Sequence, residues 1–65
     1  MTPELEKFCT RRLNVRHDIM PARKDVALEM RNVDRLVAQA KGKFTRPEIA
    51  EAVRVLVHER EYFYV

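Results

Sequence analysis

Two histidine–carboxylate pairs are the residues of this 65-residue chain whose types best suit catalysis. His17 precedes Asp18, and His58 precedes Glu59, so each imidazole has a carboxylate beside it, as in many general acid–base sites. Adjacent residues do not share a helix face, however, and neither pair comes with a nucleophile and an orienting third group. We therefore expect no catalytic residues and a protein that is not an enzyme.

The single cysteine is the remaining candidate for chemistry. Cys9 falls on the apolar face of the first predicted helix, which predicts a buried and unreactive thiol. One cysteine forms no internal disulfide, and one cysteine with two histidines lacks the paired ligand spacing of a structural zinc site. We expect no metal and no cofactor. The reduced cysteine and the lack of an apolar leader stretch favour a cytoplasmic location.

Proline and glycine divide the chain into three helical segments. Proline stands near the start of each segment, at Pro3, Pro21 and Pro47. Asp18 is the better N-cap for the second segment, and Gly42 supplies the left-handed residue that ends it. The sequence predicts helices at about 3–14, 19–41 and 45–61 within a single domain, residues 1–65.

The second helix carries an apolar stripe that predicts how the helices pack. At 100° per residue, one face collects Ile19, Ala22, Val26, Met30, Val33, Val37 and Ala40. The first and third helices are expected to pack on this stripe. The predicted fold class is therefore all-α, a small three-helix bundle with a long central helix and a short aromatic C-terminal segment. No apolar run approaches the roughly 20 residues of a membrane span, so a membrane partner is not expected.

The segment KGKFTRPEIAEAVRVL, residues 41–56, contains two signals for a helix start. Thr45 and Glu48 have the spacing of a capping box, and Phe44 and Ile49 that of a hydrophobic staple. The letters IAEA also resemble the beginning of a DNA-reading helix-turn-helix. The following AVRVLVHERE contains no glycine, proline, asparagine or serine to form the turn, so we expect one continuous helix instead.

Two groups of side chains are left as candidates for binding a partner. The first is an off-stripe leucine with nearby arginines: Leu28, Arg31 and Arg35. The second is the aromatic run at the C-terminus: Tyr62, Phe63 and Tyr64. Leu28 is also consistent with an ordinary exposed leucine, and the aromatic residues with closing the bottom of the bundle. Val55 likewise points away from the main stripe of the third helix.

These features predict a non-enzymatic protein-binding module, a regulator or inhibitor that occupies a surface on a larger partner. Small compact chains of this kind occur among modulators encoded by phages and mobile elements. A chain this short buries only about 60% of the surface of its unfolded form, so a homodimer is a further expectation.

The alternative function is binding of DNA or RNA by a small basic regulator. The net charge is +3, and residues 11–24 hold five cations against one carboxylate. The candidate phosphate-binding residues are Arg11, Arg12, Arg16, Arg23 and Lys24. No aromatic residue lies among them to stack on an unpaired base.

Overall fold

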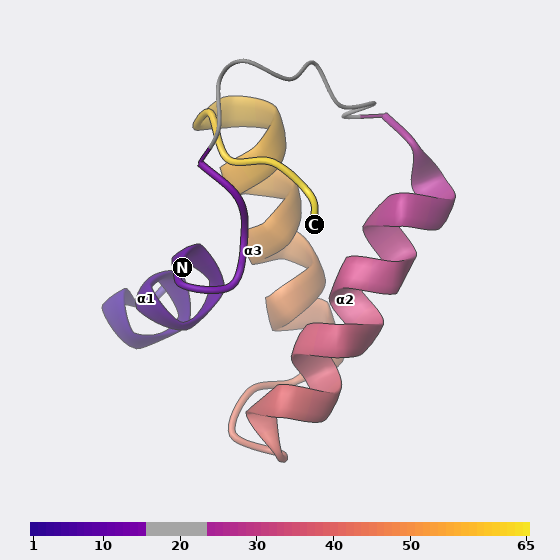
Figure 1. Cartoon of the computed structure of the whole chain (residues 1–65). Coiled ribbons are helices and arrows are strands. Elements are labelled where there is room, and N and C mark those ends of the chain that lie inside the picture. The colour runs from indigo at the N-terminus through magenta and orange to yellow at the C-terminus, as the bar shows by residue number, and fades with distance from the viewer. Residues whose placement is uncertain (16–23) are drawn as a thin grey trace.

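Three α-helices make up this computed structural model, which describes residues 1–15 and 24–65 (Figure 1). The helices are α1 (Pro3–Thr10), α2 (Val26–Ala40) and α3 (Arg46–Glu59). The predicted all-α three-helix fold with a short aromatic C-terminal segment is confirmed. None of the helices in the described part has the length and apolar character that crossing a membrane requires.

The N-terminal helix α1 is short and capped as its sequence predicts. The Thr2 hydroxyl accepts a hydrogen bond from the Leu5 amide at 3.2 Å, and Pro3 occupies the first helical position. Leu5 and Cys9, four residues apart, are buried on the same face, and Leu13 is buried beyond the helix end. The helix ends at Thr10, one turn before the predicted limit.

The central helix of the bundle is α3. Its capping box is present, since Thr45 and Glu48 each accept a hydrogen bond from the other's backbone amide. The buried side chains form a stripe wide enough to be covered on two sides: Ile49, Ala52, Val53, Leu56 and Val57. Both α1 and α2 pack against α3. The third helix therefore packs on the second as expected, but the first helix packs mainly on the third, so the central position predicted for the second helix is wrong. The helix is continuous, which excludes the helix-turn-helix interpretation.

The second helix begins later than predicted. Asp25 is its N-cap, and the carboxylate accepts a hydrogen bond from the Leu28 amide at 3.0 Å. The predicted cap Asp18 and the predicted residues 19–23 lie outside the described part of the chain, together with the stripe members Ile19 and Ala22.

The core-facing side of α2 overlaps the predicted stripe only in part. The stripe members Val33 and Ala40 are buried and Val37 packs against the core, but Val26 is 69% exposed and Met30 is 50% exposed. Leu36, outside the stripe, is buried, so at 100° per residue the buried face is rotated from the predicted stripe by about 60°. Apolar content alone predicted the stripe, but contacts with α3 and the C-terminal segment decide which face is covered.

Two left-handed residues end α2. Lys41 is the C-cap, with φ 53°, and Gly42 follows with φ 84°. The predicted glycine therefore comes one position after the cap. A Cβ atom at Gly42 meets nothing within 4 Å, so its backbone conformation, and not the space around it, favours glycine.

The C-terminal segment, residues 62–65, packs back onto the bundle, and its end lies between α3 and α2 in Figure 1. The backbones of Phe63 and Asn14 exchange two hydrogen bonds of 2.8 and 2.9 Å. The side chain of Asn32 accepts from the Val65 amide at 3.0 Å and donates to the Val65 carbonyl at 3.3 Å. Phe63 and Tyr64 are buried, so they close the bundle within the chain itself.

A polar cluster fixes the same segment from its other side. The Tyr64 hydroxyl donates to Glu29 at 2.9 Å, and Arg54 donates to the same carboxylate at 3.2 Å. Burial raises the pKa of Glu29, but the hydrogen bonds from Tyr64 and Arg54 and the charges of Arg54 and His58 bring it below its ordinary value. Burial, followed by the bond to Glu29, raises the pKa of Tyr64.

Replacing the buried amide tests how much this attachment contributes. Asn32→Ala leaves the Val65 amide without its acceptor, and we expect a loss of about 2 kcal/mol in the free energy of unfolding. Asn14→Ala is the matched control, since that exposed residue loses one side-chain bond and should lose less than about 1 kcal/mol. Urea denaturation measures the free energy of unfolding of both variants. Equal losses would show that the Asn32 side chain contributes no more to the attachment of Val65 than an exposed amide does.

Removing the Tyr64 hydroxyl should make stability depend differently on pH. Glu29 has a lowered pKa in the folded state, so its contribution is present above the unfolded value of 4.5 and is lost as pH falls through the folded value. Tyr64→Phe removes a hydrogen bond that lowers the pKa of Glu29, so the pKa of Glu29 in the folded state rises and its contribution to stability becomes smaller. We expect a cost of about 1–2 kcal/mol at pH 7 that diminishes as the pH falls below 4.5 in denaturation experiments. A pH-independent difference would contradict this account.

Candidate partner-binding groove

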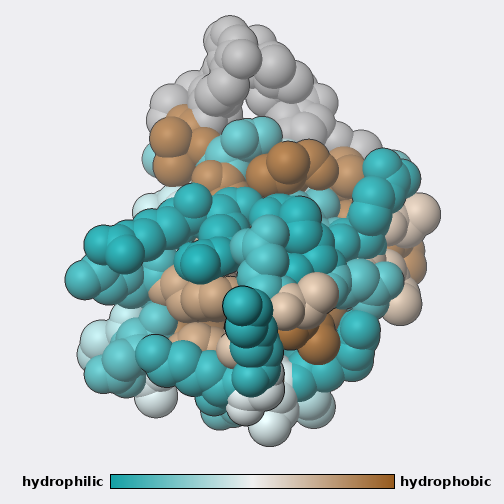
Figure 2. Space-filling view, turned by 60° about the horizontal axis from the view of Figure 1, so that its bottom comes forward, coloured by the Kyte–Doolittle hydropathy of each residue, from teal (hydrophilic) through white to brown (hydrophobic). Residues whose placement is uncertain are grey.

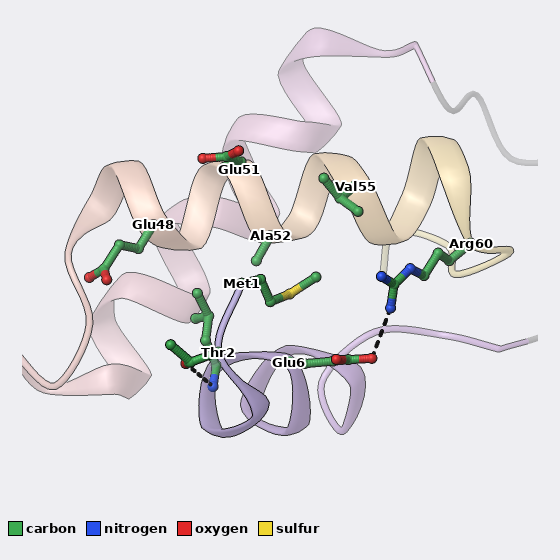
Figure 3. Close-up of a pocket in the computed structure, with 9 residues that line it drawn as sticks. Met1, Thr2, Glu6, Glu48, Glu51, Ala52, Val55 and Arg60 are labelled. Carbon is green, nitrogen blue, oxygen red and sulfur yellow. Dashed lines mark hydrogen bonds and ion pairs between the residues drawn. The ribbon is translucent and has the colours of Figure 1, made fainter.

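A groove of about 420 Å³ lies between α1 and α3 (Figure 3). It is formed by residues from the first six positions, from α3 and from just beyond it: Met1, Thr2, Leu5, Glu6, Glu48, Glu51, Ala52, Val55 and Arg60. The N-cap at Thr2 and the capping box of α3 set where both helices start.

The floor of the groove is apolar. Leu5 from α1 and Ala52 from α3 are buried beneath it, and Val55 is half-buried. Met1 is 51% exposed, and Figure 3 shows its side chain lying between the two helices. Methionine adapts its shape easily, so this side chain can adjust to an incoming apolar group.

Two carboxylates with no cationic partner in the described residues line the α3 side of the groove. Glu48 accepts hydrogen bonds from the Thr45 amide at 2.8 Å and from the Thr45 hydroxyl at 2.9 Å, and these bonds hold its pKa below the ordinary value. Glu51 is exposed one turn further along. Neither forms an ion pair among residues 1–15 and 24–65.

An ion pair lies at the other end of the groove. Arg60 contacts Glu6 at 3.0 Å, drawn as a dashed line in Figure 3. Counted over side chains, the lining holds three carboxylates and one guanidinium, which is two net negative charges at neutral pH. An apolar floor beside uncompensated carboxylates favours an occupant with an apolar side chain flanked by cations.

The first predicted partner patch is largely engaged within the chain. Leu28 packs partly against the core, and Arg35 donates to the Arg12 carbonyl at 2.9 Å and to Asn32 at 3.0 Å. Arg31 is exposed. The structure thus leaves one of these three side chains facing solvent.

The second predicted patch is also turned inward. Tyr62 is half-buried and packs on the core, and Phe63 and Tyr64 are buried. None of these aromatic side chains lines the groove. Of the residues that the sequence suggested for partner contact, Val55 alone lines the groove. The other lining residues were not predicted, because the groove forms only when residues 1–6 meet α3.

The predicted phosphate-binding residues are described in part. Arg11 and Arg12 follow the end of α1, and Lys24 is exposed just before α2. Arg16 and Arg23 lie outside the described residues.

Two of the side chains considered for chemistry, Cys9 and His58, lie in the described part of the chain, and both contact other parts of the fold. Cys9 is fully buried, as predicted, and burial raises the pKa of its thiol to about 11 against a smaller lowering by Arg12. His58 lies 3.4 Å from the Tyr64 hydroxyl and 3.9 Å from Glu29, whereas His17 is outside the described part. Within that part, no three His, Cys, Asp or Glu side chains are grouped to hold a metal ion.

No protein-family model, curated protein or solved structure matches this chain. The function is therefore inferred from the surfaces of the molecule.

The ion pair at the end of the groove should contribute little to folding. Both side chains are about half exposed, and exposed pairs are worth less than about 1 kcal/mol. We expect Arg60→Gln to change the free energy of unfolding by no more than about 0.5 kcal/mol while making the groove more negative. Chemical denaturation checks this, and a loss above 2 kcal/mol would show that Arg60 is a structural residue.

Proposed function

We propose that this chain is a non-enzymatic protein-binding module, a regulator or inhibitor that acts by holding a segment of a larger protein in the α1–α3 groove. The observation that carries the proposal is the combination of the apolar floor with Glu48 and Glu51, which have no cationic partner among the described residues.

The chemistry of the groove defines the occupant. An apolar channel between two helices suits an amphipathic helix that lays its apolar side chains into the channel. A volume of about 420 Å³ is large enough for one or two such side chains, together with the displaced part of Met1. The carboxylates of Glu48 and Glu51 select lysines or arginines beside those apolar residues and repel an acidic segment.

The polar side chains of the groove also support binding rather than catalysis. Its polar lining consists of carboxylates, one hydroxyl and one guanidinium, and the Thr2 hydroxyl is already used as the cap of α1. The Glu6 carboxylate is likewise paired with Arg60. These groups provide charge and shape for recognition, which is what a binding surface requires.

A synthetic amphipathic peptide, with leucines at helical spacing and lysines between them, tests the proposal. Titrated into isotope-labelled protein, it should shift the amide NMR signals of Leu5, Ala52 and Val55. The same peptide with glutamates in place of lysines should bind at least tenfold more weakly, because it meets Glu48 and Glu51.

Two variants whose charge changes are equal in size and opposite in sign locate the binding site. Glu51→Lys should weaken the lysine peptide about tenfold, whereas the control Arg31→Glu, on the exposed side of α2, should leave its affinity unchanged or slightly higher. The proposal would be lost if the shifted signals lay away from α1 and α3, or if the lysine and glutamate peptides bound equally.

A further inference from the structure

A second concave surface lies on the opposite flank of α1. This cleft, of about 270 Å³, forms between α1 and the turn from α2 to α3. It is lined by Glu4, Lys7, Phe8, Arg11, Arg12, Lys43 and Phe44. At 100° per residue, Lys7 and Arg11 point away from the groove-lining residues Thr2 and Glu6. The two concave surfaces therefore lie on opposite sides of α1 and have no lining residue in common.

The charge of this cleft is the reverse of that of the groove. Four cations, Lys7, Arg11, Arg12 and Lys43, face one carboxylate, Glu4, which leaves a net charge of three positive charges. None of the four forms an ion pair with a carboxylate in the described part of the chain. Cations gathered in a concavity without carboxylate partners attract polyanions.

Two aromatic rings lie among these cations, although the sequence separates them. The centroids of Phe8 and Phe44 are 5.4 Å apart, with the rings tilted by 53°. Both rings are half-buried at the cleft. The ammonium group of Lys43 is 5.7 Å from the centroid of Phe44. Folding thus supplies the aromatic residues that the basic stretch at residues 11–24 lacks.

One guanidinium is held in position over an aromatic ring. The Arg12 guanidinium carbon is 4.0 Å from the centroid of the Phe8 ring. Its Nε donates to Gln39 at 2.8 Å, and Nη1 donates to the Phe8 carbonyl at 2.9 Å. A guanidinium fixed in this way is a flat, cationic platform, and unpaired bases stack on such groups as well as on aromatic rings.

The view in Figure 2 brings the α2–α3 turn toward the reader. On this face the apolar areas are separated from one another by hydrophilic side chains. Small apolar areas separated by hydrophilic side chains suit a ligand that combines phosphates with flat bases better than a broad apolar partner.

We propose that this cleft binds a single-stranded nucleic acid. Lys7, Arg11 and Lys43 contact its phosphates, and the platform of Arg12 on Phe8, with Phe44 beside it, contacts an unpaired base. A duplex keeps its bases stacked inside, so the stacking surfaces of this cleft favour an unpaired strand. Of the four cations in the cleft, Arg11 and Arg12 belong to the predicted basic cluster, whereas Lys7 and Lys43 do not.

Fluorescence anisotropy with a labelled oligothymidine strand measures this binding. We expect affinity at low salt that falls as salt rises, with a logarithmic slope of about 0.7 for each phosphate engaged. Lys43→Gln and Arg11→Gln should each lower the slope by about 0.7 and the affinity severalfold. Arg31→Gln is the matched control, because it removes one exposed cation from a different surface and should change neither quantity.

Three comparisons decide the class of ligand. A duplex of the same length and a glutamate peptide should both bind more weakly than oligothymidine, and Phe44→Leu should reduce oligothymidine binding by several fold because it removes the ring. Circular dichroism tests whether Phe44→Leu is folded. If it is not, the Lys43→Gln and Arg11→Gln variants decide the proposal. No binding at low salt, equal losses with Arg31→Gln, or a preference for the duplex or the peptide would overturn the inference.

Discussion

The pairing of one buried amide with the backbone of the last residue holds the C-terminal end of the bundle together. Asn32 is 1% exposed, and its side chain makes hydrogen bonds to Val65, Leu28 and Arg35 that satisfy both its donor and its acceptor. A buried amide is costly unless it is paired in this way, so the segment and the residue require one another. In the described part of the chain, no buried side-chain polar atom lacks a partner. Phe63 and Tyr64 are brought into the core by this attachment.

Local signals in the sequence were sufficient for the third helix and less so for the second. The capping box of Thr45 and Glu48 acts over a few residues, so the start of α3 follows directly from its own sequence. The exposed face of α2 depends on α3 and on residues 62–65, which lie far along the chain. A polar residue such as Asn32 carries no apolar signal for burial, and its role becomes visible only when Val65 lies beside it. For the same reason the groove and the cleft, which combine distant segments, were not predicted.

The surface of the molecule separates its charges across a single short helix. One flank of α1 contributes Glu6 to a groove with a negative lining, and the other contributes Lys7 and Arg11 to a cleft with a positive lining. With a net charge of only +3, the composition conceals this separation. Two ligands of opposite charge can therefore approach the same small molecule from different sides, each attracted by its own surface.

The length of α1 gives this arrangement a dynamic consequence. A helix of eight residues does not persist on its own in water, so α1 remains folded only while Leu5 and Cys9 stay docked against α3. Release of α1 would remove both concave surfaces together, because each is lined by residues of this helix. A ligand on either flank favours the docked helix and thereby lowers the ordering cost for a ligand on the other. Both proposed surfaces therefore depend on the same docked helix.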